Sequence, residues 1–269
     1  MFGLSGNSPF DLSWRLLGIS VRIKVSFWLV WLALGLLIPD LALWRVLSWM
    51  AVVLVSFFVH ELGHVLVGRM FGVRGGIVIG AFGGAPTGNY QPLRRWQRIL
   101  LYAAGPAISF GLWGATEAYR THANPNAWGG NAALVIWWII VRAKDLNFFW
   151  ACINLLPIYP LDGGMIVRDI LEAIFPRNGL VFSLLTSLAC AGGLAAYSAY
   201  AYWHPNAWHW GLPLLNLVFD GMLAVQSLFL LIQSLCIHCR EVKNCPWKLM
   251  RIHVHATGSK LRTVYSFVC

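Results

Sequence analysis

Long apolar runs, separated by short polar segments, dominate this sequence. A helix that crosses a bilayer needs about 20 mostly apolar residues, and several runs approach or exceed that length, so the pattern predicts about six spanning helices. The run at 132–141 is either a helix on the outer surface or an early start of the fourth span. The six predicted spans lie at about 26–38, 46–71, 99–119, 146–157, 180–203 and 212–235.

A glycine-rich stretch at 72–88 follows the second span. It reads GVRGGIVIGAFGGAPTG, and so many glycines disfavour a stable helix. We therefore expect a non-helical segment between the second and third spans.

Composition supports a membrane protein and excludes most soluble classes. The chain has 269 residues, of which 58% are hydrophobic and 11% charged, and its mean hydropathy is +0.65. Soluble domains carry about 25% charged residues. We expect an all-α polytopic membrane fold with one embedded core at 26–235, a cytoplasmic N-terminal segment at 1–25 and a basic cytoplasmic tail at 236–269.

The net charge of +10 agrees with this topology. With the N-terminus in the cytoplasm, 16 basic residues fall in inner segments and four in outer ones, as the positive-inside rule requires. Both termini are therefore predicted to be cytoplasmic, in a cell membrane of the bacterial inner-membrane type. The lipid bilayer is the expected partner, and a nucleic acid is not, because no basic face is interleaved with stacking aromatics. The four outer basic residues are Arg45, Arg120, Arg142 and Lys144.

The second span contains the sequence His60-Glu61-Leu-Gly-His64, an HExxH pattern. Residues four apart lie about 40° from each other around a helix, so both imidazoles share one face. Such a pair supplies half of a tetrahedral zinc site, and the adjacent Glu61 can take a proton from metal-bound water. The alternative is a polar patch used for helix packing, although ionisable groups within a span usually mark function.

A third metal ligand is required, and two aspartates in apolar surroundings are candidates. Asp162 is favoured because Pro157 and Pro160 interrupt the helix before it and the glycines from Gly163 allow close backbone approach. Its alternative role is to cap a following helix at 163–175. For Asp220 in the sixth span, helix packing is the favoured role. Two histidines and one aspartate leave a fourth position open, which indicates one catalytic Zn²⁺ per chain.

HELGH at 60–64, together with NLLPIYPLDGG at 154–164, resembles the site-2 protease family of intramembrane zinc metalloproteases. The resemblance implies that His60, His64 and Asp162 bind zinc and that Glu61 is the catalytic base. It also implies a zinc metalloendopeptidase that cleaves a transmembrane protein substrate within or beside its span. The alternative is a membrane protein without protease activity, either a metal transporter or a degenerate scaffold that keeps the fold.

Further stretches are similar to this family. Residues 73–84 resemble its membrane-associated β-hairpin, which is thought to hold unwound substrate as an added strand, although a plain loop is the alternative. Gly105 and Pro106 resemble its Gly-Pro element, which family members often follow with an asparagine where this chain has Ser109. Asn154 matches an asparagine that either bonds the substrate backbone or stabilises a helix break. The predicted substrate-positioning residues are Asn154, Pro157, Gly163, Gly105 and Pro106.

Overall fold

The computed structural model describes residues 8–36, 42–81, 83–90, 92–122, 130–204, 220–221, 223–232, 256–257 and 260–261. The chain divides into two compact units, Met1–Gly179 and Leu180–Cys269. The first unit contains every residue of the predicted metal site. Its elements are β1 (Leu12–Leu16), β2 (Ile19–Ile23), α1 (Val25–Gly35), α2 (Leu43–Met70), β3 (Gly76–Gly80), β4 (Gly83–Thr87), α3 (Arg95–His122), α4 (Gly130–Asn154) and α5 (Asp162–Ile174).

The second unit is described in part. It contains α6 (Gly179–Trp203), helical residues 220–221 and 223–232, and a two-stranded pair of β5 (Ala256–Thr257) and β6 (Lys260–Leu261). Within it, the Ser198 hydroxyl donates a 2.6 Å hydrogen bond to Asp220 Oδ2. Half of the predicted span at 212–235 lies outside the described residues.

Three helices in the described part of the chain are long and apolar enough to cross a membrane: α2, α3 and α6. They correspond to the second, third and fifth predicted spans. The first predicted span forms α1, which has 11 residues. The run at 132–141 belongs to α4, one continuous helix of 25 residues that also contains most of the predicted fourth span. Arg142, Lys144 and Asp145 lie in the middle of α4, so every stretch of that helix long enough to cross a membrane contains charged residues.

The predicted hairpin is present as β3 and β4, but it forms half of a larger sheet. The strand order is β1-β2-β3-β4, in which β2 and β3 are parallel and the other two pairs are antiparallel. The strands β1 and β2 come from the predicted N-terminal segment. Their connection has positive φ at Leu17 (48°) and Gly18 (74°), which suits a tight two-residue hairpin turn.

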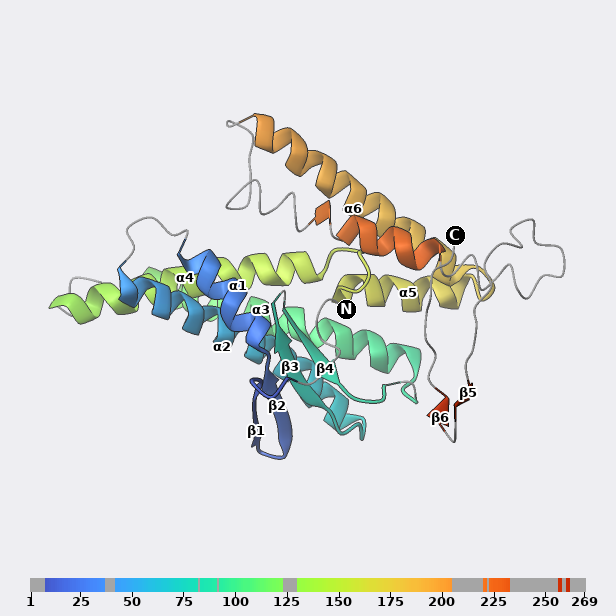
Figure 1. Ribbon diagram of the computed structural model, residues 1–269, viewed down its shortest axis with the longest axis horizontal. Coiled ribbons are helices and arrows are strands. Elements are labelled where there is room, and N and C mark those ends of the chain that lie inside the picture. Colours follow the sequence, from blue (N-terminus) through green and yellow to red (C-terminus); the bar gives the residue numbers. More distant parts are fainter. Residues whose placement is uncertain are drawn as a thin grey trace. The chain divides into compact units, whose positions relative to one another are not determined.

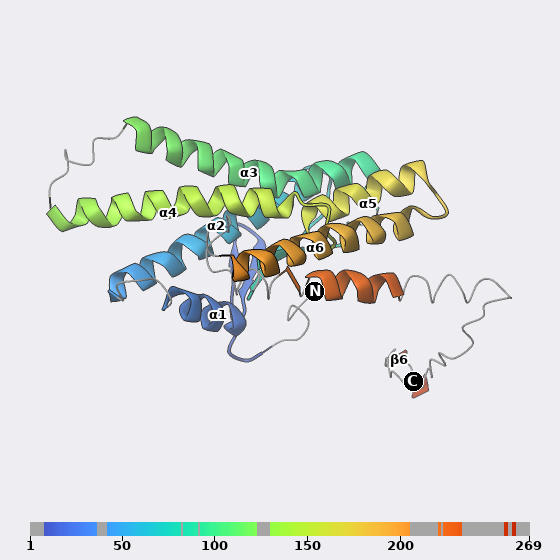
Figure 2. The ribbon, with the colours of Figure 1, turned by 90° about the horizontal axis from the view of Figure 1, so that it is seen from above.

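The apolar face of the sheet packs on α1, α2 and α4, and this contact holds the site in place (Figure 1). Ile19, Val21 and Ile23 of β2 are buried together with Ile77 and Ile79 of β3. They join one core with Phe27, Val53, Phe57 and Trp150. In Figure 2, α3 and α4 run side by side, and α3 also packs against α2. The sheet and the helices α1, α3 and α4 therefore surround α2, whose C-terminal half contains the HExxH sequence.

Candidate metal centre

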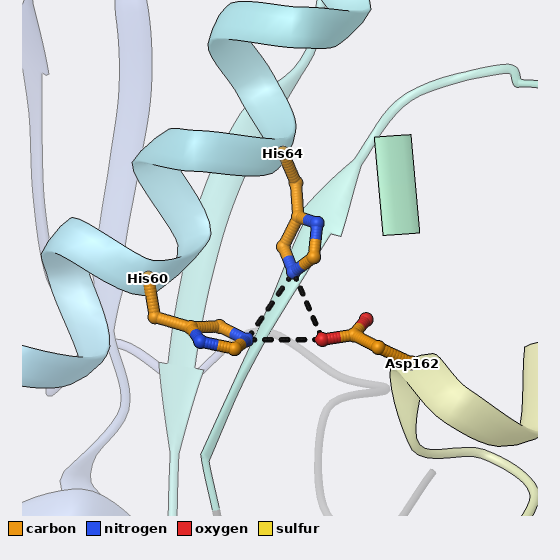
Figure 3. Close-up of side chains that lie close together, drawn as sticks. All are labelled: His60, His64 and Asp162. Carbon is orange, nitrogen blue, oxygen red and sulfur yellow. Dashed lines mark hydrogen bonds and ion pairs between the residues drawn. The ribbon is translucent and has the colours of Figure 1, made fainter. Parts of the chain in front are cut away.

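The two histidines of α2 point to one place, as their spacing predicts. Both side chains are buried, and their Nε2 atoms lie 3.3 Å apart (Figure 3). One turn of helix separates them, so their relative position follows from helix geometry alone.

Asp162 completes the group from the start of α5. Its Oδ2 lies 3.1 Å from His60 Nε2 and 3.3 Å from His64 Nε2. The residue that caps α5 is Leu161, and no side-chain hydrogen bond caps this helix, so the carboxylate of Asp162 contacts the histidines rather than the helix end. Within the described part of the chain, these three residues are the one group of this kind that can hold a metal ion, with all three ligand atoms within 4.8 Å of one another.

Hydrogen bonds on the far side of each imidazole orient the rings. His60 Nδ1 lies 3.0 Å from Ser109 Oγ, and His64 Nδ1 lies 2.7 Å from the carbonyl oxygen of Leu101. A carbonyl oxygen only accepts, so His64 Nδ1 carries the proton and its Nε2 presents a lone pair. When Ser109 accepts in the same way, both Nε2 atoms are available as ligands, which is the usual arrangement around protein-bound metals.

Sequence reasoning did not give Ser109 or Leu101 a role in the site. A signal was present, because Leu101, Gly105 and Ser109 follow one another at four-residue spacing in α3. All three are buried, and they form the stripe of α3 that faces the two histidines.

Gly105 leaves the space that a metal ion needs. A Cβ atom at this position would lie 2.3 Å from His64 Nε2 and 2.6 Å from His60 Nε2, so any larger residue would collide with both ligand atoms. Two imidazole nitrogens and one carboxylate oxygen are a ligand set that catalytic zinc sites use. The residues of this chain therefore fit a zinc ion.

Glu61 follows His60 in α2 and is 3% exposed. Gly84 of β4 packs directly on its side chain, since a Cβ there would lie 2.3 Å from Glu61 Cγ. In the described part of the chain, Glu61 Oε2 is buried and has no hydrogen-bond partner. An unsolvated carboxylate oxygen of this kind is a good proton acceptor.

Tyr90 lies outside the helices, between β4 and α3. Burial, with a smaller contribution from the charge of Glu61, raises the pKa of its phenol to about 12. The phenol is therefore neutral at physiological pH and does not compete for the proton of a neighbouring acid.

Contacts around α5 bring Asp162 to the histidines. A Cβ at Gly163 would lie 2.2 Å from the carbonyl oxygen of Leu155, and one at Gly164 would lie 2.4 Å from the carbonyl carbon of Ile158. Both glycines therefore permit the tight turn between α4 and α5, as expected from sequence. Asp169 lies about two turns after Asp162 in α5. It pairs with Arg98 of α3, whose Nε lies 3.1 and 3.0 Å from the two carboxylate oxygens.

The other predicted positioning residues lie around this centre. Gly105 contacts both histidines, and Pro106 is buried beside it in α3. Pro157 lies in the α4–α5 turn, where Gly163 also packs. The Asn154 amide is buried and donates a 2.9 Å hydrogen bond to the carbonyl oxygen of Trp150, which stabilises the last turn of α4.

Trp150 of α4 is an apolar neighbour of the site that sequence reasoning did not identify. Its ring stacks on Phe57 at 4.1 Å between centroids and lies 6.3 Å from the ring of His60. A Cβ at Gly83 would lie 2.9 Å from Trp150 Cζ2. This core tryptophan therefore packs between Phe57 and the metal centre and also contacts the start of β4.

Comparison with known proteins gives three related findings. The sequence profile of peptidase family M50 matches residues 124–191. A zinc metalloprotease of Methanocaldococcus jannaschii is 29% identical over 163 residues, covering 59% of this chain and 44% of that protein. A candidate zinc metalloprotease of Synechocystis is 32% identical over 120 residues, covering 44% of this chain and 30% of that protein. The chain thus spans less than half the length of these curated relatives.

A solved structure shares the fold. The site-2 protease from Methanocaldococcus jannaschii matches with a TM-score of 0.54 and 20% identity, covering 81% of this chain and 94% of that one. The M50 match includes the segment from Asn154 to Gly164, and HELGH at 60–64 lies outside it.

Proposed function

We propose that the chain is a member of peptidase family M50, the site-2 protease family, and that it is an intramembrane zinc metalloprotease; its similarity to this family and to two zinc metalloproteases supports the proposal. Its reaction is the hydrolysis of a peptide bond within or beside a transmembrane segment of a membrane protein. One observation carries the proposal, which is the convergence of His60 Nε2, His64 Nε2 and Asp162 Oδ2 beside the buried carboxylate of Glu61.

His60, His64 and Asp162 would hold the zinc ion. When bound, zinc supplies Lewis acidity at the scissile carbonyl and lowers the pKa of water towards neutrality. The Nδ1 hydrogen bonds to Ser109 and to the carbonyl oxygen of Leu101 would orient both imidazoles so that their Nε2 atoms face the ion.

Glu61 is the proposed catalytic base. Its unpartnered Oε2 takes a proton from the attacking water and delivers it to the amide nitrogen, which leaves as an amine. Because the side chain is buried against Gly84, bulk water does not stabilise its charge, and the carboxylate keeps its affinity for a proton.

The substrate must present an extended peptide to this site, because a spanning helix hides its peptide bonds in its own hydrogen bonds. The strand β4 is one edge of the sheet and contacts Glu61 through Gly84. A substrate segment added to β4 would form backbone hydrogen bonds irrespective of its sequence. Gly105 and Pro106 would leave room beside the ligands, while Asn154, Pro157 and Gly163 would shape the turn that faces the substrate.

The proposed location is a bacterial-type cell membrane, with residues 1–25 and 236–269 both on the cytoplasmic side of the core at 26–235. The count of basic residues between apolar runs supports this orientation. In this topology the HExxH sequence lies in the inner half of α2.

The decisive experiment replaces Glu61 with glutamine, which keeps the shape of the side chain and removes its basicity. The assay uses purified full-length protein and a fluorescently labelled single-span peptide whose apolar segment is interrupted by Gly and Pro. Glu61→Gln should abolish cleavage and keep one zinc per chain by metal analysis. The control Glu117→Gln changes a half-exposed residue that pairs with Arg120 in α3, and it should cleave at the normal rate.

Two outcomes would contradict the proposal. Undiminished cleavage by Glu61→Gln would remove the catalytic base from the mechanism. Zinc-dependent flux into proteoliposomes, with no cleavage by the unmodified chain, would instead favour a transporter.

A further inference from the structure

The strand β1 and the residues beside it present a row of large apolar side chains that no described residue of the first unit covers. Phe10 is 80% exposed, Leu12 is 53% exposed and Leu17 is 87% exposed, and Trp14 and Leu16 between them are also exposed. We propose that the β1–β2 hairpin docks on the membrane interface and recognises anionic phospholipid. The inference rests on the membrane location in the proposed function and is independent of protease activity.

The exposed row continues a buried surface. Leu12, Trp14 and Leu16 pair across the strands with Ile23, Val21 and Ile19 respectively, and directly paired residues share one face of a sheet. The three residues of β2 are buried in the core, whereas their three partners on β1 are exposed. The apolar face of the sheet therefore extends one strand beyond the helices that cover it.

The tip of the hairpin is tied to the end of a spanning helix. Arg69, in the last turn of α2, donates a 3.2 Å hydrogen bond from Nη1 to the carbonyl oxygen of Leu17. Since α2 is long enough to span the bilayer, this bond holds the tip at the level where the span ends. Figure 1 shows the β1–β2 hairpin projecting from the helices of the first unit at this end of α2. The hairpin thus reaches the zone where lipid headgroups meet the acyl chains.

The charge of the opposite face suits a phosphate headgroup. Arg15 is exposed there and pairs across the strands with Ser20, while Arg22 pairs with Ser13. Neither strand contains an acidic residue. Asp11, just before β1, is engaged internally and accepts hydrogen bonds from the backbone N–H groups of Ser8 and Val25. A hairpin lying flat in the interface would place its apolar row among acyl chains and Arg15 among headgroups.

Lipid explains the exposed surface better than a protein partner does. A peptide strand added to β1 would bond to the backbone edge and leave the apolar face of the row uncovered. The hairpin also leads directly into α1, where Leu29, Leu32 and, just after the helix, Leu36 are exposed, as residues that face acyl chains are in a spanning protein. The row on β1 and the exposed leucines of α1 would both be in contact with the same leaflet.

A depth measurement tests the docking. The full-length chain, with its six cysteines replaced by serine, receives a nitroxide at Leu16→Cys or at Ser13→Cys and is reconstituted in vesicles with about one-third phosphatidylglycerol. The label at 16 should collide mainly with oxygen, which concentrates among acyl chains. The label at 13, on the opposite face, should collide mainly with a water-soluble nickel chelate.

Two results would overturn the docking. Equal nickel accessibility at both positions would place the apolar row in water. A label at 16 that is shielded from both reagents would show that protein, for example a second copy of this chain, covers the row. Neither readout requires cleavage, so a failure here is distinct from a failure of the proposed function.

A second arm tests headgroup recognition. Raising the phosphatidylglycerol fraction from zero should shift the label at 16 deeper, and Arg15→Gln should raise the fraction needed for half of this shift by up to about five-fold. Arg177→Gln removes the same charge from an exposed position between α5 and α6 and should leave the response unchanged. An unaltered response in Arg15→Gln would refute the role of this face in anionic lipid binding.

Discussion

The hydrogen bond between Ser109 and His60 offers a sharp test of how the metal centre is organised. In Ser109→Ala, His60 Nδ1 loses its 3.0 Å partner in a position with no access to water, because Ser109 is fully buried. The imidazole can then rotate or change tautomer. Loss of such a supporting contact typically weakens metal binding about 10–100-fold, which corresponds to about 1.4–2.8 kcal/mol.

Zinc affinity is measured by competition with a series of chelators in detergent, using the full-length protein. Ser109→Thr keeps the hydroxyl and should retain most of the affinity. The control Ser183→Ala removes a buried serine of α6 whose hydroxyl donates a hydrogen bond to the carbonyl oxygen of Leu180 in the same helix, and it should bind zinc normally. Normal zinc affinity in Ser109→Ala would refute the argument that Ser109 orients His60.

Three further predictions concern packing around the site. Gly105→Ala should lose zinc, because its Cβ would lie 2.3 Å from a ligand nitrogen, whereas Gly111→Ala, with open space at its Cβ, should keep it; equal zinc content in both would contradict the geometry. Gly84→Ala should slow cleavage while zinc is retained, because its Cβ would displace the catalytic carboxylate; unchanged kcat would refute this contact. Asp169→Asn should destabilise the protein by about 2–4 kcal/mol, because Arg98 loses its buried partner, and an unchanged Tm would show that the pair does not hold α5 in place.

The HExxH helix and the turn before Asp162 could be predicted because each depends on local rules. His60 and His64 share a face of any α-helix, and the prolines and glycines around Asp162 fix a break wherever they occur. The proposed zinc ligands could therefore be named from the sequence, and the structure brings the three side chains together in a group that could hold a metal ion.

The features that the sequence did not predict, namely the larger sheet and the role of Ser109, depended on contacts between distant segments. The strands β1 and β2 are five residues long and appear in the sequence only as a mixed polar and apolar segment, and β2 finds its partner β3 more than 50 residues later. Ser109 lies 49 residues from His60, so no local pattern joins them. In α4, the charges at 142–145 interrupted the apolar run and concealed a single continuous helix.

The parallel pairing of β2 with β3 also constrains how the chain threads the bilayer. Residues 21–23 lie beside residues 77–79 with the same direction, so the chain leaves the sheet at the end of β2 and must return to the opposite end of the sheet to enter β3. In the proposed topology the sheet lies on one side of the membrane, so the segment between the two strands, which includes α1 and α2, would cross the membrane an even number of times. The 28 residues of α2 give about 42 Å of helix, enough for one full crossing, whereas the 11 of α1 give about 16 Å. In that topology the crossing before α2 needs more chain than α1 alone provides. The pairing of β2 with β3 would then hold both ends of this connection on one side of the membrane.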